Sequence, residues 1–256
     1  MRSILIFLYN LKGGLFKRII PSILRKNFFN SKIQIIDLKF FKIKLNLRNS
    51  IDREIYLKGF YEKKQLNYLY KISKNVNIDT FLDVGSYIGY YSLFFKNIKR
   101  VHAFEPNKDN FKTLQFNNKI NKSKIIAHNI ACSDKSEKSK IWYTDSNKMG
   151  GSSIYDENDF ELSKYEKNDL KFESVNLKKL DDIIKTKNQN LLIKIDVERH
   201  EINVLRGAYN LLTNNKIILQ VEVHKDLESK VFKFLKNNKF YFINSIGPDH
   251  YFKNYY

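Results

Sequence analysis

The sequence predicts an α/β fold in which a mostly parallel sheet carries helices on both faces. Short apolar runs alternate with amphipathic segments along most of the 256 residues. One run, 78–82, leads directly into an acid, two spaced glycines and a helical pattern. The next run, 100–104, is followed by another acid. The chain is long enough for one such domain and an N-terminal extension.

The strand at 78–82 is followed by a turn suited to ligand binding. Gly85 has no Cβ, so the chain can turn sharply and lie close to a ligand. Gly89 is expected to let the following helix pack closely on the strand. Ligands of open parallel sheets bind just past the carboxyl ends of the strands. We therefore expect Asp83, Gly85, Ser86 and Gly89 to form part of a binding site.

The second strand ends at Glu105, about twenty residues beyond Gly85, the spacing at which an acid meets a ribose in dinucleotide folds. Pro106 suits the first turn of the next helix. The turn at 85–89 lacks the middle glycine of a pyrophosphate loop, and Asp83 would repel a phosphate. These features predict a nucleoside ligand without a pyrophosphate, and a cationic amino-acid nucleoside fits both acids.

Three segments resemble motifs of the FkbM-type S-adenosylmethionine-dependent methyltransferases, in the Rossmann-like class I group. Residues 83–92 resemble the first motif, 103–106 the second and 191–198 a later one. The resemblance covers residues 56–244. It implies a seven-stranded, mostly parallel sheet with helices on both faces, and S-adenosyl-L-methionine as the cofactor.

The predicted domain limits are 1–55 for the extension and 56–256 for the methyltransferase-like domain. Residues 1–30 form a basic amphipathic segment that either lies on a membrane surface or, as we favour, packs on protein. Alternating apolar residues at 32–47 predict one or two strands. The resemblance assigns the Gly/Ser segment 149–154 to the acceptor pocket or a lid.

A third strand is predicted at 124–131. In class I methyltransferases the segment after this strand flanks the adenine, so the resemblance implies cofactor contacts for Ala131 and Ser133. Ser133 also fits a simple turn residue.

A fourth strand, 191–196, has the continuous apolar character of a strand buried on both faces. It brings Asp196 to the same edge as Asp83 and Glu105. Further strands are expected at 216–224 and 240–243, with a closing antiparallel hairpin at 251–256.

Methyl transfer to an oxygen is an in-line displacement that needs alignment and a base for the acceptor hydroxyl. Asp196 and His224 are the predicted catalytic residues, since both reach the edge where acceptor and methyl must meet. An imidazole pKa can lie near the working pH, although an exposed strand-end histidine would look the same. Asp83 is placed for the cationic methionine end, or it caps the turn. Glu105 is placed for the ribose.

Asp196, Glu198 and Glu222 could together hold a hard divalent cation, but we predict no metal site. The chain departs from the resembled family at Arg199-His200, where members usually carry Gly-Ala before another Glu. Bulky basic residues there would narrow the pocket or bind an anionic acceptor.

The formal net charge is +19, from 46 Lys and Arg against 27 Asp and Glu. Such charge favours nucleic acid or an anionic membrane as partner, but the lysines are scattered, which favours compositional drift. The single Cys132 excludes an intramolecular disulfide and a Cys-rich zinc site. It suits a cytoplasmic protein, and the basic N-terminus leaves peripheral membrane association open.

The function expected from the resemblance is O-methylation of a small-molecule or sugar hydroxyl in glycan or secondary-metabolite biosynthesis. Two alternatives stay open. An RNA or DNA methyltransferase is favoured by the charge, but no Asn-Pro-Pro-Tyr-like motif follows the fourth strand, so a nucleic acid partner is not expected. A catalytically inactive cofactor-binding module is the alternative that Arg199-His200 suggests.

Overall fold

The computed structural model describes residues 33–144 and 170–255. These residues belong to two compact units, one over 33–63 and the other over 64–144 and 170–255. The domain limits given above, 1–55 and 56–256, stay a prediction. The predictions for residues 1–30 and 149–154 fall outside the described residues. No helix among the described residues is long and apolar enough to cross a membrane.

The smaller unit holds a β-hairpin and a helix. Strands β1 (Ile33–Asp37) and β2 (Lys42–Asn46) pair antiparallel, as the alternation at 32–47 predicts. Helix α3 (Ser50–Lys58) follows, and its first-turn Asp52 accepts a 2.6 Å hydrogen bond from the Asn46 N–H. This bond ties the helix start to the end of the hairpin.

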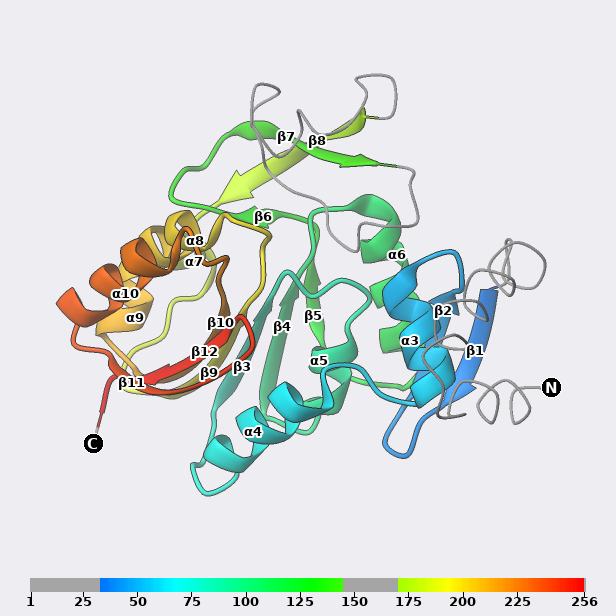
Figure 1. Cartoon of the computed structure of the whole chain (residues 1–256), viewed down its shortest axis with the longest axis horizontal. Helices are drawn as coiled ribbons and strands as arrows, with labels where there is room; N and C mark the ends of the chain where they lie inside the picture. Colours follow the sequence, from blue (N-terminus) through cyan, green and yellow to red (C-terminus); the bar gives the residue numbers. More distant parts are fainter. Residues whose placement is uncertain (1–32, 145–169, 256) are drawn as a thin grey trace. The chain divides into compact units, whose positions relative to one another are not determined.

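The larger unit is built on a seven-stranded sheet in the order β11-β12-β10-β9-β3-β4-β5 (Figure 1). The strands are β3 (Thr80–Val84), β4 (Arg100–Phe104), β5 (Ile126–His128), β9 (Asn190–Ile195), β10 (Lys216–Glu222), β11 (Tyr241–Ile246) and β12 (Asp249–Lys253). Only β12 runs antiparallel to its neighbours, β10 and β11. The predicted seven-stranded, mostly parallel sheet is confirmed.

Helices lie on both faces of this sheet, with α4, α5 and α6 on one side and α7 to α10 on the other (Figure 1). Their bounds are α4 (Lys63–Ser73), α5 (Tyr90–Phe94), α6 (Lys108–Ile120), α7 (Leu180–Ile183), α8 (Glu201–Gly207), α9 (Tyr209–Thr213) and α10 (Glu228–Asn237). A large group of buried apolar side chains joins the central strands to α7, α8, α9 and α10. Burial of this apolar area is the main force that holds the layers together.

A second sheet of three strands lies outside the central one. It contains β6 (Ala131–Cys132), β7 (Lys138–Thr144) and β8 (Leu170–Lys178), in the order β6-β8-β7. The predicted third strand, 124–131, was therefore too long. Its central-sheet part ends at His128, and the side-chain amide of the next residue, Asn129, donates to the carbonyls of Glu105 and Pro106 at 2.9 Å each.

Two histidines pair at the edge of the central sheet. His102 Nδ1 and His128 Nε2 are 3.0 Å apart, and the His128 ring stacks on Phe104 with centroids 4.6 Å apart. Burial and the neighbouring imidazole lower the pKa of His102 to about 4, and burial lowers the pKa of His128. The folded protein therefore favours two neutral rings at this edge.

We expect this pair to make stability fall with acidification. The unfolded chain protonates His102 near its ordinary pKa of 6.5, whereas the folded chain does so only near about 4. The stabilisation is therefore complete above pH 6.5 and is lost as the pH falls toward about 4. Urea unfolding of His102→Phe should show a weaker loss over this range than the wild type. His224→Gln leaves the pair intact and should keep the full loss; equal slopes for wild type and His102→Phe would contradict the assignment.

Candidate active site

Three acids meet at the carboxyl edge of three adjacent strands. Asp83 lies near the end of β3, Glu105 directly follows β4, and Asp196 directly follows β9. Strand β3 lies between the other two, and its Val84 pairs with the last residue of each. The expected gathering of Asp83, Glu105 and Asp196 at one edge is therefore observed.

The turn after β3 needs glycine because another backbone passes directly over it. Gly85 has φ +83°, and a Cβ there would lie 1.7 Å from the Asp196 carbonyl oxygen. Gly89 has φ +84°, and a Cβ there would lie 3.3 Å from the side chain of Leu114 in α6. The close packing at Gly89 is thus against α6, not against the strand as predicted.

Ser86 and Tyr87, the two residues after Gly85, present polar groups at the carboxyl edge of the sheet. Ser86 is buried, and its Oγ has no hydrogen-bond partner among the described residues. Tyr87 has φ +51°, and its N–H donates to Glu105 Oε2 at 2.9 Å. A buried hydroxyl without a partner costs free energy, which a ligand with a complementary polar group would recover.

The Glu105 carboxylate bridges the turn and the start of α6. Its Oε2 accepts from Tyr87, and its Oε1 accepts from the Asn107 N–H at 2.9 Å. Burial raises the pKa of Glu105 to about 8, against the effect of these hydrogen bonds. The Asn110 side-chain amide also donates to Oε1, at 3.4 Å, so Oε2, with one internal donor, is the oxygen that can still accept from a ligand.

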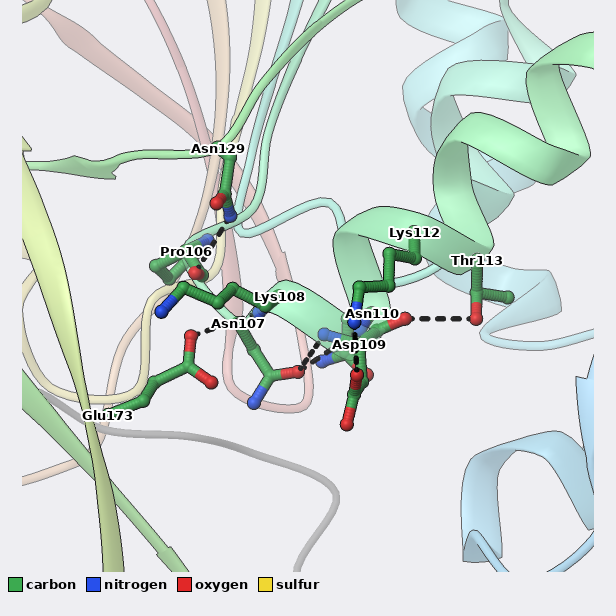
Figure 2. Close-up of polar contacts among 9 residues, drawn as sticks. All are labelled: Pro106, Asn107, Lys108, Asp109, Asn110, Lys112, Thr113, Asn129 and Glu173. Carbon is green, nitrogen blue, oxygen red and sulfur yellow. Dashed lines mark hydrogen bonds and ion pairs between the residues drawn. The ribbon is translucent and has the colours of Figure 1, made fainter.

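The start of α6 is firmly capped beside this acid (Figure 2). Asn107 is the N-cap, and its Oδ1 accepts from the N–H groups of Asp109 and Asn110 at 3.1 and 3.0 Å. Glu173 of β8 accepts from the Lys108 N–H at 3.0 Å. Pro106 lies just before the cap, outside the first helical turn where it was expected.

Asp83 is engaged inside the protein. Its Oδ2 accepts from the N–H and the Oγ–H of Ser92 in α5, at 2.9 and 2.5 Å. Burial raises the pKa of Asp83, while the charge of Lys194 acts in the opposite direction. These contacts match the turn-capping alternative, and a contact with the methionine end of the cofactor stays a prediction.

Lys194 is a site residue that the sequence analysis missed. It lies in β9 directly beside Asp83, is 3% exposed, and places its Nζ 2.7 Å from Asp196 Oδ2. The Nζ also lies 4.7 Å from the centre of the Tyr91 ring. The available signal was a lone lysine inside an otherwise apolar strand, since such a charge is buried only with partners.

The other predicted catalytic residue, His224, follows β10, and its partner Glu198 lies in the segment after Asp196. His224 Nε2 lies 3.6 Å from Glu198 Oε2, and both side chains are partly exposed. Burial and the Asp196 charge raise the pKa of Glu198. The carboxylate oxygens of Asp196 and Glu222 approach within 4.8 Å of one another. The ammonium group of Lys194, which binds Asp196, already balances part of the negative charge of Asp196 and Glu222.

Arg199 and His200, where the sequence departs from the family pattern, both bind other side chains of the protein. Arg199 has φ +77°, a conformation that favours glycine, and its guanidinium binds both carboxylate oxygens of Asp226. The His200 Nε2 lies 2.9 Å from Ser133 Oγ. Glu201 is buried, and burial raises its pKa to about 7. Glu201 Oε1 accepts from the Arg199 N–H at 2.8 Å, so the turn closes despite the bulky residues.

The two predicted adenine contacts lie in other surroundings. Ala131 is buried with Ile141, Val175 and Leu177 in the core of the small sheet. Ser133 is buried against His200, and its N–H donates to the Lys178 carbonyl at 2.9 Å. Their contact with a cofactor stays a prediction, as do the predicted cofactor contacts of the remaining residues: Gly85, Ser86, Gly89, Glu105, Pro106 and Asp196.

Comparison with known proteins gives a family match. Residues 83–244 match the methyltransferase FkbM domain. No curated protein matches the sequence.

Several solved structures are similar at low identity. The methyltransferase FkbM from Methylobacillus flagellatus KT is 16% identical, with a TM-score of 0.46, over 78% of this chain and 52% of that one. A tRNA (uracil-54, C5)-methyltransferase from Pyrococcus abyssi, in complex with S-adenosyl-L-homocysteine, is 11% identical, with a TM-score of 0.47, over 87% and 43%. The tRNA m1G37 methyltransferase of M. jannaschii is 12% identical, with a TM-score of 0.46, over 88% and 56%. This chain thus spans about half the length of each.

Gly85→Ala should destabilise the protein far more than Gly247→Ala. Both glycines have positive φ, +83° and +64°, but only Gly85 faces a backbone atom, since a Cβ at Gly247 meets nothing within 4 Å. The strain of the left-handed conformation costs about 1–2 kcal/mol at either position. The overlap with Asp196 adds to this cost at Gly85. Urea unfolding measures both variants, and equal losses would refute the close backbone crossing.

Lys194→Met should destabilise the protein by about 3–5 kcal/mol, the cost of leaving a buried charge without its partner. Since the Asp83 carboxyl then favours its neutral form more strongly, the deficit should shrink as the pH falls. Adding Asp83→Asn should recover part of the loss. The exposed strand lysine Lys216 provides the control, and Lys216→Met should stay within about 0.5 kcal/mol of wild type in denaturant unfolding. A matching small loss for Lys194→Met would rule out its role as counter-ion.

Proposed function

Because the chain belongs to the FkbM methyltransferase family, we propose that it transfers a methyl group from S-adenosyl-L-methionine to a hydroxyl of a small molecule or sugar, in glycan or secondary-metabolite biosynthesis. The observation that carries the proposal is the Glu105 carboxylate. It lies at the carboxyl end of β4 and is held toward the glycine turn by the Tyr87 N–H. In such folds, an acid in this place binds ribose hydroxyls.

The residues of the edge fit the cofactor in chemistry as well as in position. The ribose hydroxyls would donate to Glu105, and the unpartnered Ser86 Oγ offers a further polar contact beside them. The cofactor supplies a methyl group on a sulfonium, whose positive charge suits an edge that gathers Asp83 and Asp196. Lys194 limits this negative charge, so that the acids do not simply repel one another.

For the acceptor, we assign proton removal to His224. Glu198, 3.6 Å away, stabilises the imidazolium that forms when the ring takes the hydroxyl proton. Asp196, fixed through Lys194, orients the acceptor hydroxyl at the edge beside Gly85. Most of the rate then comes from alignment of the hydroxyl with the methyl group in a fixed electrostatic environment.

An inactive cofactor-binding module is the second candidate, and Arg199 is its motivation. In the structure its guanidinium is bound by Asp226, and Glu201 closes the turn through the Arg199 N–H. Both contacts favour an intact site over a degraded one. Location in the cytoplasm is part of the proposal, and packing of the basic residues 1–30 on protein remains favoured over contact with a membrane surface.

Isothermal titration of S-adenosylmethionine tests the cofactor site. At a pH above about 8, where the Glu105 carboxyl is ionised, Glu105→Ala should weaken binding by about 1.5–3 kcal/mol, the scale of hydrogen bonds to a charged group. Glu173→Ala is the matched control, because Glu173 also binds the start of α6 but is not assigned to the ribose. It should bind like the wild type. A folded wild type that does not bind S-adenosylmethionine would overturn the proposed function.

A further inference from the structure

The outer face of the β7–β8 strand pair gathers cations and aromatic rings. Side chains alternate across a strand, and Trp142 pairs with Phe172 while Lys140 pairs with Ser174. We call the resulting set the β7–β8 platform. It consists of Lys138, Lys140, Trp142, Phe172, Ser174, Asn176 and Lys178, which share one face by register.

The two faces of this strand pair differ sharply in character. The opposite face carries Ile141, Val175 and Leu177, which are buried, together with the acid Glu173 and, at its end, the exposed Lys171. On the platform, Phe172 is 50% exposed, and none of the seven side chains is acidic. A solvent-facing surface with apolar rings and several ammonium groups, without a compensating acid among its members, fits an anionic partner.

The geometry of the rings bears on what kind of anion fits. The rings of Trp142 and Phe172 lie 5.1 Å apart and tilted by 52°, and Lys140 Nζ lies 4.4 Å from the Phe172 centroid. A nucleic acid base stacking on Phe172 would have to displace this ammonium group. An acidic sugar can instead pair its charged group with Lys140 and place its C–H groups against the tilted rings.

The platform also has a short connection to the candidate active site. On the other face of the same strand, Glu173 accepts from the Lys108 N–H, three residues beyond Glu105 (Figure 2). A chain molecule lying on the platform is therefore bound to an element that directly contacts the ribose side of the site. The platform has neighbouring lysines two residues apart on one strand, a repeat that suits a polymer with regularly spaced charges.

We propose that the β7–β8 platform binds an anionic glycan, whose sugars carry carboxylate or phosphate groups, as the docking site for the acceptor. That the bound glycan is the methyl acceptor rests on the proposed function. The inference narrows the acceptor class to acidic glycans. Binding to the platform itself does not depend on methyl transfer, so the two proposals can fail separately.

The chain contains a single tryptophan, and it lies on the platform, so its fluorescence reports on this surface alone. The probes are oligogalacturonate as the acidic glycan, maltoheptaose as an uncharged glycan, and oligouridylate as single-stranded RNA, all at about 0.15 M salt to screen diffuse attraction. We expect a saturable change in Trp142 fluorescence with oligogalacturonate, and weaker binding of the other two.

The variants are Lys140→Glu, Phe172→Ser and the control Lys253→Glu. Lys253 also lies near an aromatic ring, 5.8 Å from the Tyr255 centroid, but on a different strand. Lys140→Glu should weaken oligogalacturonate binding by about tenfold or more, because it replaces an attraction with a like-charge repulsion. Phe172→Ser should weaken it as well, and Lys253→Glu should leave it within about twofold of wild type.

Three results would overturn the inference. One is a lack of any fluorescence change with oligogalacturonate, or an equal change with maltoheptaose. Another is an equal loss in Lys253→Glu, which would mean unspecific attraction to the basic chain. The third is tighter binding of oligouridylate with the same dependence on Lys140 and Phe172, which would assign the platform to RNA. Circular dichroism confirms that each variant is folded, and calorimetry with S-adenosylmethionine tests the proposed function independently.

Discussion

The buried ammonium group of Lys194 is the interaction on which the candidate site depends. Three adjacent strands deliver acids to one edge, and such like charges repel one another when they leave water. Lys194 lies in β9, beside Asp83 of the middle strand β3, and binds Asp196 directly at 2.7 Å. The Tyr91 ring, 4.7 Å away, gives the cation a further favourable contact. The acids can therefore remain close enough to serve one ligand.

Backbone crossings fix the geometry around this charge. The Asp196 carbonyl passes over Gly85 so closely that any side chain there would overlap it, and the Asp196 N–H bonds to the Val84 carbonyl. The glycine turn and the acid of the next strand are thus one rigid element. Main-chain contacts of this kind hold a site more exactly than side chains on mobile loops. The acidic edge is preassembled in the folded protein.

Much of this could be predicted from the sequence, because apolar runs ending in acids identify parallel strands and their common edge. Asp83, Glu105 and Asp196 were found in this way. The third strand was predicted too long, since its apolar run continues past the bend at Asn129, whose side chain bonds to two carbonyls distant in sequence. Lys194 was missed because a strand pattern does not show which charges are paired. Its ion pair with Asp196 is local, but its place beside Asp83 depends on the register between β9 and β3, which a single sequence does not display.

The internal hydrogen bonds to both carboxylate oxygens of Glu105 have a consequence for ligand recognition. Its two oxygens already accept from the N–H groups of Tyr87 and Asn107, so under the proposed function a ribose would meet an acceptor that is already hydrogen-bonded. The free energy gained on binding is therefore the difference between two sets of hydrogen bonds, not the strength of the new set. A change that weakens the internal bonds would tighten the grip on the nucleoside. Under the proposed function, cofactor affinity would be set by competition between the ligand and the protein's own main chain.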